Sequence, residues 1–67
     1  MKTSEILSAK VTTINVDVCT TFFNKFAKHY KLTNDQIKKA WSNFEELSSM
    51  DITLEIAIAT AIAFAKF

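Results

Sequence analysis

The sequence predicts an all-α fold: a small bundle of three main helices, at about 16–31, 34–48 and 52–66, preceded by a short N-terminal helix or arm. The chain contains no glycine and no proline, so the residues that make tight hairpin turns are missing. Apolar residues recur at three- and four-residue spacing in its central part. At 67 residues it has room for one helical domain, spanning residues 1–67.

The N-terminal region carries two competing signals. Ile6, Leu7 and Ala9 predict a short helix over residues 4–10, capped by Thr3 or Ser4. Residues 11–21 are rich in β-branched side chains, and their apolar members alternate with polar neighbours, which is typical of a strand. A lone strand has no partner for its backbone groups, so helix or irregular structure is favoured. The alternative is an α+β fold with residues 11–20 as a strand.

The segment at 16–31 has an amphipathic helical pattern. Asn15 or Asp17 is the expected N-cap. Basic residues crowd its end, where cations favour the negative pole of the helix dipole. Its apolar positions are Val18, Phe22, Phe23, Phe26, Ala27 and Tyr30.

The helix at 34–48 has the best-marked start in the sequence. Thr33 and Gln36 form a predicted capping box, and Leu32 and Ile37 hold the positions of a hydrophobic staple around it. The short connector before it makes this helix the antiparallel neighbour of the preceding one. Its apolar face is Ile37, Ala40, Trp41, Phe44 and Leu47.

The C-terminal segment 52–66 begins after Asp51, which we expect to be its N-cap. Its large apolar residues alternate with small or polar ones, a period typical of a strand. Its five alanines and the absence of turn residues favour a helix instead. With this helix included, the predicted core is Phe22, Phe26, Tyr30, Leu32, Ile37, Trp41, Phe44, Leu47, Ile58 and Ile62.

Self-association is expected from this last helix. Its large side chains spread most of the way around a helical wheel, and a helix that is apolar on all sides must be buried on all sides. A chain this short buries only ~60% of its unfolded surface, and with one cysteine it cannot form an internal disulfide. The expected interface is Leu54, Ala57, Ile58, Ala61, Ile62 and Ala65. The alternative is a central bundle helix with some exposed apolar atoms.

The residue inventory argues against enzymatic activity, and we expect no catalytic, cofactor-binding or metal site. His29 has lysines rather than an orienting acid beside it in sequence, and Cys19 reads as a small buried apolar residue. Adjacent Glu45 and Glu46 point about 100° apart on a helix, so they do not form a carboxylate pair. No glycine-rich phosphate loop exists.

The charged residues form two groups. Acidic residues gather around the connector near residue 50, and basic ones around the connector near residue 32. The expected contact residues for a partner or for nucleic acid are Lys25, Lys28, Lys31, Lys38 and Lys39. The absence of arginine and a net charge of only +1 weigh against nucleic acid.

We therefore expect a protein–protein interaction module that binds itself, as a homodimer or small oligomer, and an unidentified larger protein. Adaptors, inhibitors and regulatory accessory proteins of small viral or mobile-element genes are of this kind. Non-sequence-specific nucleic-acid binding is the alternative. No stretch of signal-peptide type follows the first residues, and the longest uncharged apolar run, 56–65, is about half of the ~20 residues that span a bilayer. We expect a cytoplasmic protein with no membrane contact.

Overall fold

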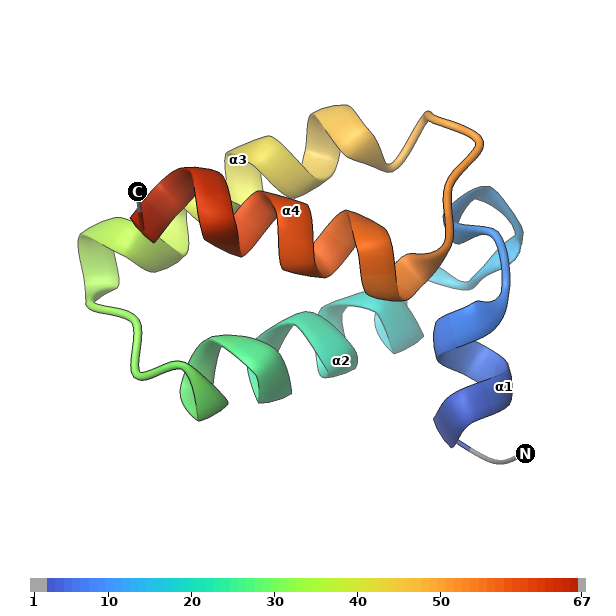
Figure 1. The fold of residues 1–67 in the computed structure, drawn as a ribbon, viewed down its shortest axis with the longest axis horizontal. Coiled ribbons are helices and arrows are strands. Elements are labelled where there is room, and N and C mark those ends of the chain that lie inside the picture. Colours follow the sequence, from blue (N-terminus) through green and yellow to red (C-terminus); the bar gives the residue numbers. More distant parts are fainter. Residues whose placement is uncertain (1–2, 67) are drawn as a thin grey trace.

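The computed structural model describes residues 3–66, which form four α-helices and one 3₁₀ turn (Figure 1). The elements are α1 (Thr3–Ser8), η1 (Val11–Thr13), α2 (Val16–His29), α3 (Asn34–Leu47) and α4 (Leu54–Lys66). The predicted all-α class is confirmed. The alternative with residues 11–20 as a strand is wrong, since this segment holds the 3₁₀ turn and the start of α2. Within the described range the only β pairing is an isolated antiparallel bridge between Lys10 and Thr53.

Helix α4 is the hub of the bundle. It packs against α1, α2 and, most extensively, α3, to which it runs antiparallel (Figure 1). Its neighbours therefore cover one side of it completely. The buried apolar core of the molecule consists of Val11, Cys19, Phe22, Phe23, Ala27, Ala40, Phe44, Leu54, Ala57, Ile58, Ala61 and Ile62.

The contact between α3 and α4 is built from small residues. Ala40 of α3 and Ala57 and Ala61 of α4 have no exposed surface. Small side chains allow two helix backbones to approach closely. The Asn43 side-chain amide donates a hydrogen bond of 3.3 Å to the Ala61 carbonyl, which links the two helices directly.

Helix α2 is held by aromatic rings instead. The ring of Phe23, 1% exposed, lies edge-on to Trp41 at 5.1 Å between centroids and 5.8 Å from the ring of Phe44. Trp41 and Phe44 are themselves stacked at 5.5 Å. These three rings fill the space between α2 and α3, because large side chains hold helix backbones apart.

The predicted starts of α2 and α3 are confirmed. The Asn15 side chain accepts a 2.7 Å hydrogen bond from the Asp17 amide at the start of α2. At α3 both bonds of the capping box are present: the Gln36 amide donates to Thr33 Oγ1, and the Thr33 amide donates to Gln36 Oε1. Local sequence signals were sufficient at both positions.

Two other cap predictions are wrong. Helix α4 begins at Leu54, and its cap is Thr53, whose hydroxyl accepts from the Ile56 amide at 3.3 Å. Asp51 instead lies exposed in the connector, 3.5 Å from the Lys10 ammonium. Helix α1 already includes Thr3 and Ser4, so neither residue precedes it as a cap.

The connector between α2 and α3 turns without glycine. Lys31 adopts a left-handed backbone conformation, with φ of 55°. Its amide donates to the Lys28 carbonyl, and the Leu32 amide donates to the Ala27 carbonyl. This pair of bonds is a Schellman motif, which usually has glycine at the left-handed position. A lysine there bears a steric penalty of about 1 kcal/mol.

Backbone hydrogen bonds join the segment around η1 to the segment that leads into α4. The Val11 amide donates to the Ile52 carbonyl at 2.8 Å, and the Leu54 amide donates to the Ala9 carbonyl at 3.0 Å. These bonds flank the Lys10–Thr53 bridge and fix the start of α4 beside η1.

The predicted core is confirmed in most positions. Tyr30 is the exception: it is 46% exposed, because α2 ends before it and it occupies the C-cap. Four predicted residues are buried, namely Phe22, Phe44, Ile58 and Ile62. Five more pack against the core while partly exposed, namely Phe26, Leu32, Ile37, Trp41 and Leu47.

Candidate functional site: the exposed side of α4 and the charged ends

The interface residues predicted on α4 lie in the core of the single chain. Leu54, Ala57, Ile58 and Ala61 have no exposed surface, Ile62 is 4% exposed, and Ala65 packs against the core. A partner reaches these side chains only if the bundle opens. This stripe is the inner side of a central bundle helix, the arrangement that the sequence offered as the alternative. Self-association itself stays a prediction, and it requires other residues.

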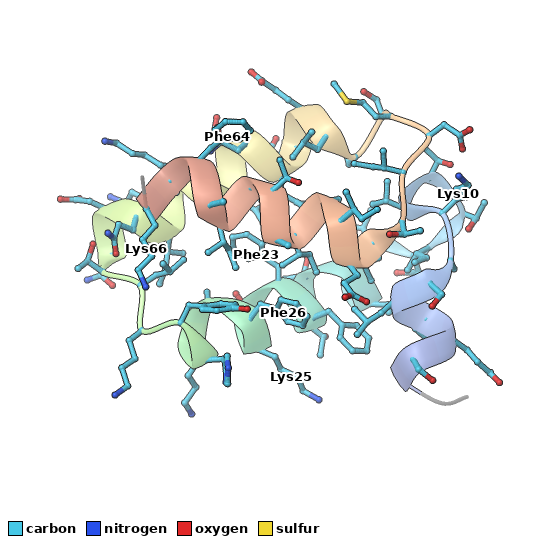
Figure 2. All side chains as sticks on the ribbon, in the orientation of Figure 1. Lys10, Phe23, Lys25, Phe26, Phe64 and Lys66 are labelled. Atoms are coloured by element: carbon cyan, nitrogen blue, oxygen red, sulfur yellow. The ribbon has the colours of Figure 1, made fainter. Side chains whose placement is uncertain are left out.

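The opposite side of α4 exposes large apolar side chains. Phe64 is 73% exposed and Ile56 is 52% exposed, and the exposed Ala59 and Ala63 lie between them along the helix. Figure 2 labels Phe64 on the part of α4 that runs beside α3. The sequence contained the signal: positions 54, 57, 58, 61, 62 and 65 form a three- and four-residue stripe, so 56, 59 and 63 must face away from it. That stripe was assigned to an interface with a second chain instead of to the core, so the residues opposite it were not considered.

The five lysines predicted as contact residues are all exposed. Lys25 and Lys28 lie in the second half of α2 and Lys31 in the connector, while Lys38 and Lys39 lie in the first half of α3. Lys66, at the end of α4, was missed because it is distant in sequence. Figure 2 labels Lys66 at the end of α4. Its ammonium donates to the Tyr30 carbonyl at 3.3 Å and lies 6.0 Å from the centre of the Tyr30 ring.

The acidic residues lie at the other end of the α3–α4 pair. Glu45 and Glu46 are near the end of α3, and Glu55 is in the first turn of α4. Because the two helices are antiparallel, these ends adjoin. The α3–α4 pair therefore has an acidic end and a basic end.

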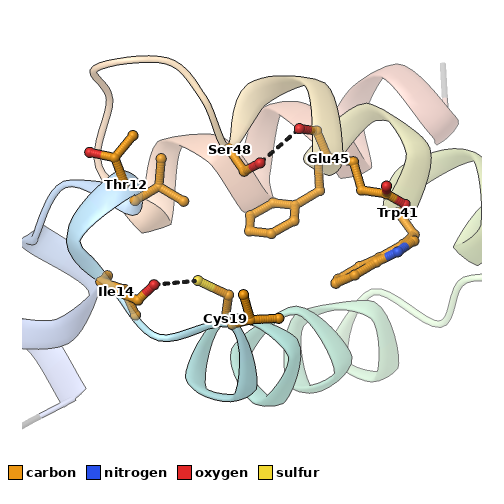
Figure 3. A pocket seen from close by; sticks show the side chains of 9 residues that line it. Thr12, Ile14, Cys19, Trp41, Glu45 and Ser48 are labelled. Carbon is orange, nitrogen blue, oxygen red and sulfur yellow. Dashed lines mark hydrogen bonds between the residues drawn. The ribbon is translucent and has the colours of Figure 1, made fainter.

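A cavity of about 400 Å³ lies between η1, α2 and α3, and Figure 3 shows its lining. Cys19, Trp41 and Phe44 form part of its apolar wall. The Cys19 thiol makes a long contact of 3.9 Å with the Ile14 carbonyl. Burial raises the pKa of this thiol, while a hydrogen bond from the backbone of Cys19 itself acts in the opposite direction. Cys19 is thus protonated at neutral pH and a poor nucleophile.

A shallower groove runs between α2 and α4. It is bordered by Lys25, Phe26, His29, Tyr30 and Glu55. His29 is exposed, and its ring packs edge-on against that of Tyr30 at 5.1 Å. In residues 3–66 no three histidine, cysteine or acidic side chains come together in a way that would hold a metal ion.

No helix of the described chain combines the length and apolar character needed to cross a membrane. Comparisons with protein-family models, with curated proteins and with solved structures find no match to this chain.

Proposed function

We propose that this chain is a protein–protein interaction module. It forms a homodimer or small oligomer and acts as an adaptor, inhibitor or regulatory accessory protein by binding a larger protein. The observation that carries the proposal is the exposure of Phe64 and Ile56, at 73% and 52%, on the helix that also forms the centre of the core. Large apolar side chains grouped on one surface element mark interaction sites more often than isolated ones do.

The energetics support this proposal. Fully burying a phenylalanine or isoleucine side chain contributes about 1.5–3 kcal/mol. The other helices of the bundle cover the inner side of α4 and leave the Phe64 and Ile56 side chains exposed, so the chain itself does not supply this burial energy. A second protein surface supplies that burial. The charged ends of the α3–α4 pair provide orientation and selectivity rather than affinity.

Light scattering behind size exclusion, over a hundredfold range of concentration, tests self-association. We expect the mass to rise toward a dimer or small oligomer, and Phe64→Thr to shift the transition to higher concentration. Val16→Thr is the matched control, because Val16 is 71% exposed but begins α2. A monomeric mass for the unmodified protein at every concentration would refute self-association.

Nucleic-acid binding is a second candidate. It is favoured by the position of Lys66 beside the exposed Tyr30, which adds a cation to the basic end and places an aromatic ring there. Lysines that contact phosphates give a binding constant that falls steeply with salt. Fluorescence anisotropy with random-sequence DNA and RNA at low salt tests it: binding that Lys28→Glu combined with Lys39→Glu abolishes supports it, and no binding by the unmodified protein ends it.

A further inference from the structure

We infer that a second copy of this chain is the occupant of the exposed side of α4, bound antiparallel about a two-fold axis near residue 60. The inference rests on the proposed self-association and specifies its geometry. Three features carry it: the order of large and small residues on α4, the positions of its charges, and the charges on the adjoining side of α3.

The apolar residues of the exposed side are ordered for an antiparallel pair. Ile56 is near one end, Phe64 near the other, and Ala59, the half-buried Thr60 and Ala63 lie between them. In an antiparallel pair centred near residue 60, Ile56 of one chain faces the region of Phe64 in the other, and this contact occurs twice. The small residues between them let the backbones approach.

The charges of α4 are self-complementary only in the antiparallel orientation. Glu55 and Lys66 are its only charged residues. They are eleven positions apart, which is close to three full helical turns, so they lie on the same flank of α4. In the antiparallel arrangement, Glu55 of each copy faces Lys66 of the other copy. A parallel, in-register arrangement would set like charges together.

The adjoining side of α3 carries the same pattern. Lys39, Asn43 and Glu46 recur at four- and three-residue spacing and so share one side of the helix. The bond from Asn43 to the Ala61 carbonyl establishes that this side borders α4.

One axis serves both pairs of charges. The same bond places residue 43 level with residue 61, so the midpoint between Lys39 and Glu46 falls within about one residue, ~1.5 Å, of the midpoint between Glu55 and Lys66. The exposed Lys39 and Glu46 then also face their opposites in the second copy. This accounts for a charge order that α3's own dipole does not favour, with lysines toward its start and glutamates toward its end.

The expected dimer is weak. A standard specific interface buries about 800 Å² per partner, and one side of a 13-residue helix with the flank of α3 offers a smaller surface than that. Its charge pairs lie at the rim, where salt screens them. We therefore expect association that depends on protein concentration and that weakens as salt is raised.

Charge reversal tests the orientation by sedimentation equilibrium at low salt. In the antiparallel dimer, Glu55→Lys places the new lysine opposite Lys66 of the other copy, and symmetry repeats this repulsion at a second place. We expect the dissociation constant of the dimer to rise about tenfold. Adding Lys66→Glu restores opposite charges, so the double variant should regain most of the affinity. In a parallel dimer Glu55→Lys merely exchanges one like-charge pair for another. Urea unfolding of each variant at low concentration corrects for changes in the monomer, including loss of the Lys66–Tyr30 bond.

Disulfide trapping in a Cys19→Ser background gives an independent measurement. A mixture of Glu55→Cys and Lys66→Cys chains should form mixed disulfide dimers under mild oxidation. Glu55→Cys alone should not, because in the antiparallel pair two copies of this position lie ~16 Å apart along the helix axis. Thr60→Cys, close to the axis, should cross-link with itself.

The outcomes separate the two proposals. A monomer at every concentration overturns self-association and this inference together. Two results would overturn the antiparallel α4 interface but not self-association. One is a dimer that cross-links through Glu55→Cys alone. The other is a dimer whose dissociation constant is unchanged by Glu55→Lys and by Phe64→Thr. A dimer that weakens with the single reversal, recovers with the double one and yields the mixed disulfide supports the antiparallel α4 interface.

Discussion

Helices α3 and α2 meet the rest of the bundle in different ways. Helix α3 approaches α4 across alanines, and a side-chain amide of one helix reaches the backbone of the other. Helix α2 is kept at a distance by the rings of Phe23, Trp41 and Phe44. Small residues give many close backbone contacts, whereas a few large rings give strong contacts at isolated points.

The difference predicts where the molecule opens. Both the cavity shown in Figure 3 and the groove on the other side border α2. An element flanked by gaps loses fewer contacts when it detaches. We therefore regard α3–α4 as the rigid unit of this protein and α2 as its more easily released cover.

The largest expected effect comes from a charge inside the rigid unit. Ala61 has no exposed surface, so Ala61→Glu buries a carboxylate without a partner and should lower the free energy of unfolding by at least ~3 kcal/mol. Ala59→Glu is the control, because Ala59 is exposed on the same helix. Urea denaturation followed by circular dichroism compares them. Equal stabilities would contradict the assignment of this stripe to the core.

A smaller loss is expected where α2 is anchored. Phe23→Leu removes the ring that touches Trp41 and Phe44, and should destabilise the protein by about 1–2 kcal/mol. Phe26→Leu, at a partly exposed position of the same helix, should lose less. Trp41 fluorescence, together with unfolding midpoints, reports both changes. A greater loss for Phe26→Leu would show that α2 is anchored elsewhere.

The connector offers a change in the opposite direction. Lys31→Gly relieves the left-handed backbone strain and should raise stability by about 1 kcal/mol, less what glycine adds to the freedom of the unfolded chain. Lys28→Gly, inside α2, should instead lower it by about 0.5–1 kcal/mol. Thermal melts distinguish the pair by the sign of the shift in Tm. A destabilised Lys31→Gly protein would mean that the left-handed conformation of Lys31 costs less than the freedom that glycine adds to the unfolded chain.

The smallest effect is the response of Cys19 to alkaline pH. Its folded-state pKa is raised by burial, so the unfolded chain loses the thiol proton first as pH increases. The contribution of this group to stability is complete below the unfolded pKa, near 9.0, and is lost as pH rises through the folded pKa. Between pH 7 and 10, the free energy of unfolding should fall more steeply with pH for the native chain than for Cys19→Ala. Identical slopes would mean that the thiol is solvated.

Sequence reasoning succeeded where the physical cause is local. The cap of α3 needs only Thr33 and Gln36, three residues apart, and the helical preference of the alanines in α4 prevailed over its alternating pattern. Sequence reasoning failed where contacts with distant parts of the chain determine the local backbone. Asp51 has the right side chain for a cap, but pairing of Lys10 with Thr53 fixes the backbone there, and Thr53 becomes the cap instead.

The candidate surface was harder to predict than the fold. The residues chosen as an interface on α4 lie in or against the core of the single chain. The sequence shows that this helix needs burial, but it does not state whether the same chain or a second one supplies it. The spacing on α4 already implies that Ile56 faces outward, whereas the exposure of Phe64 follows only from the placement of α1, α2 and α3 around α4. Lys66 joined the basic end for the same reason, through a contact with Tyr30 thirty-six residues away.

The bonds that join residues 9–11 to residues 52–54 have a consequence for the order of folding. They close a loop that contains α2 and α3, so they form only after the chain has lost the entropy of bringing the two ends of that loop together. The α3–α4 hairpin, joined by a short connector, closes a much smaller loop and should assemble early. We therefore expect α1 and η1 to attach last and to hold the start of α4 in place once the hairpin has formed.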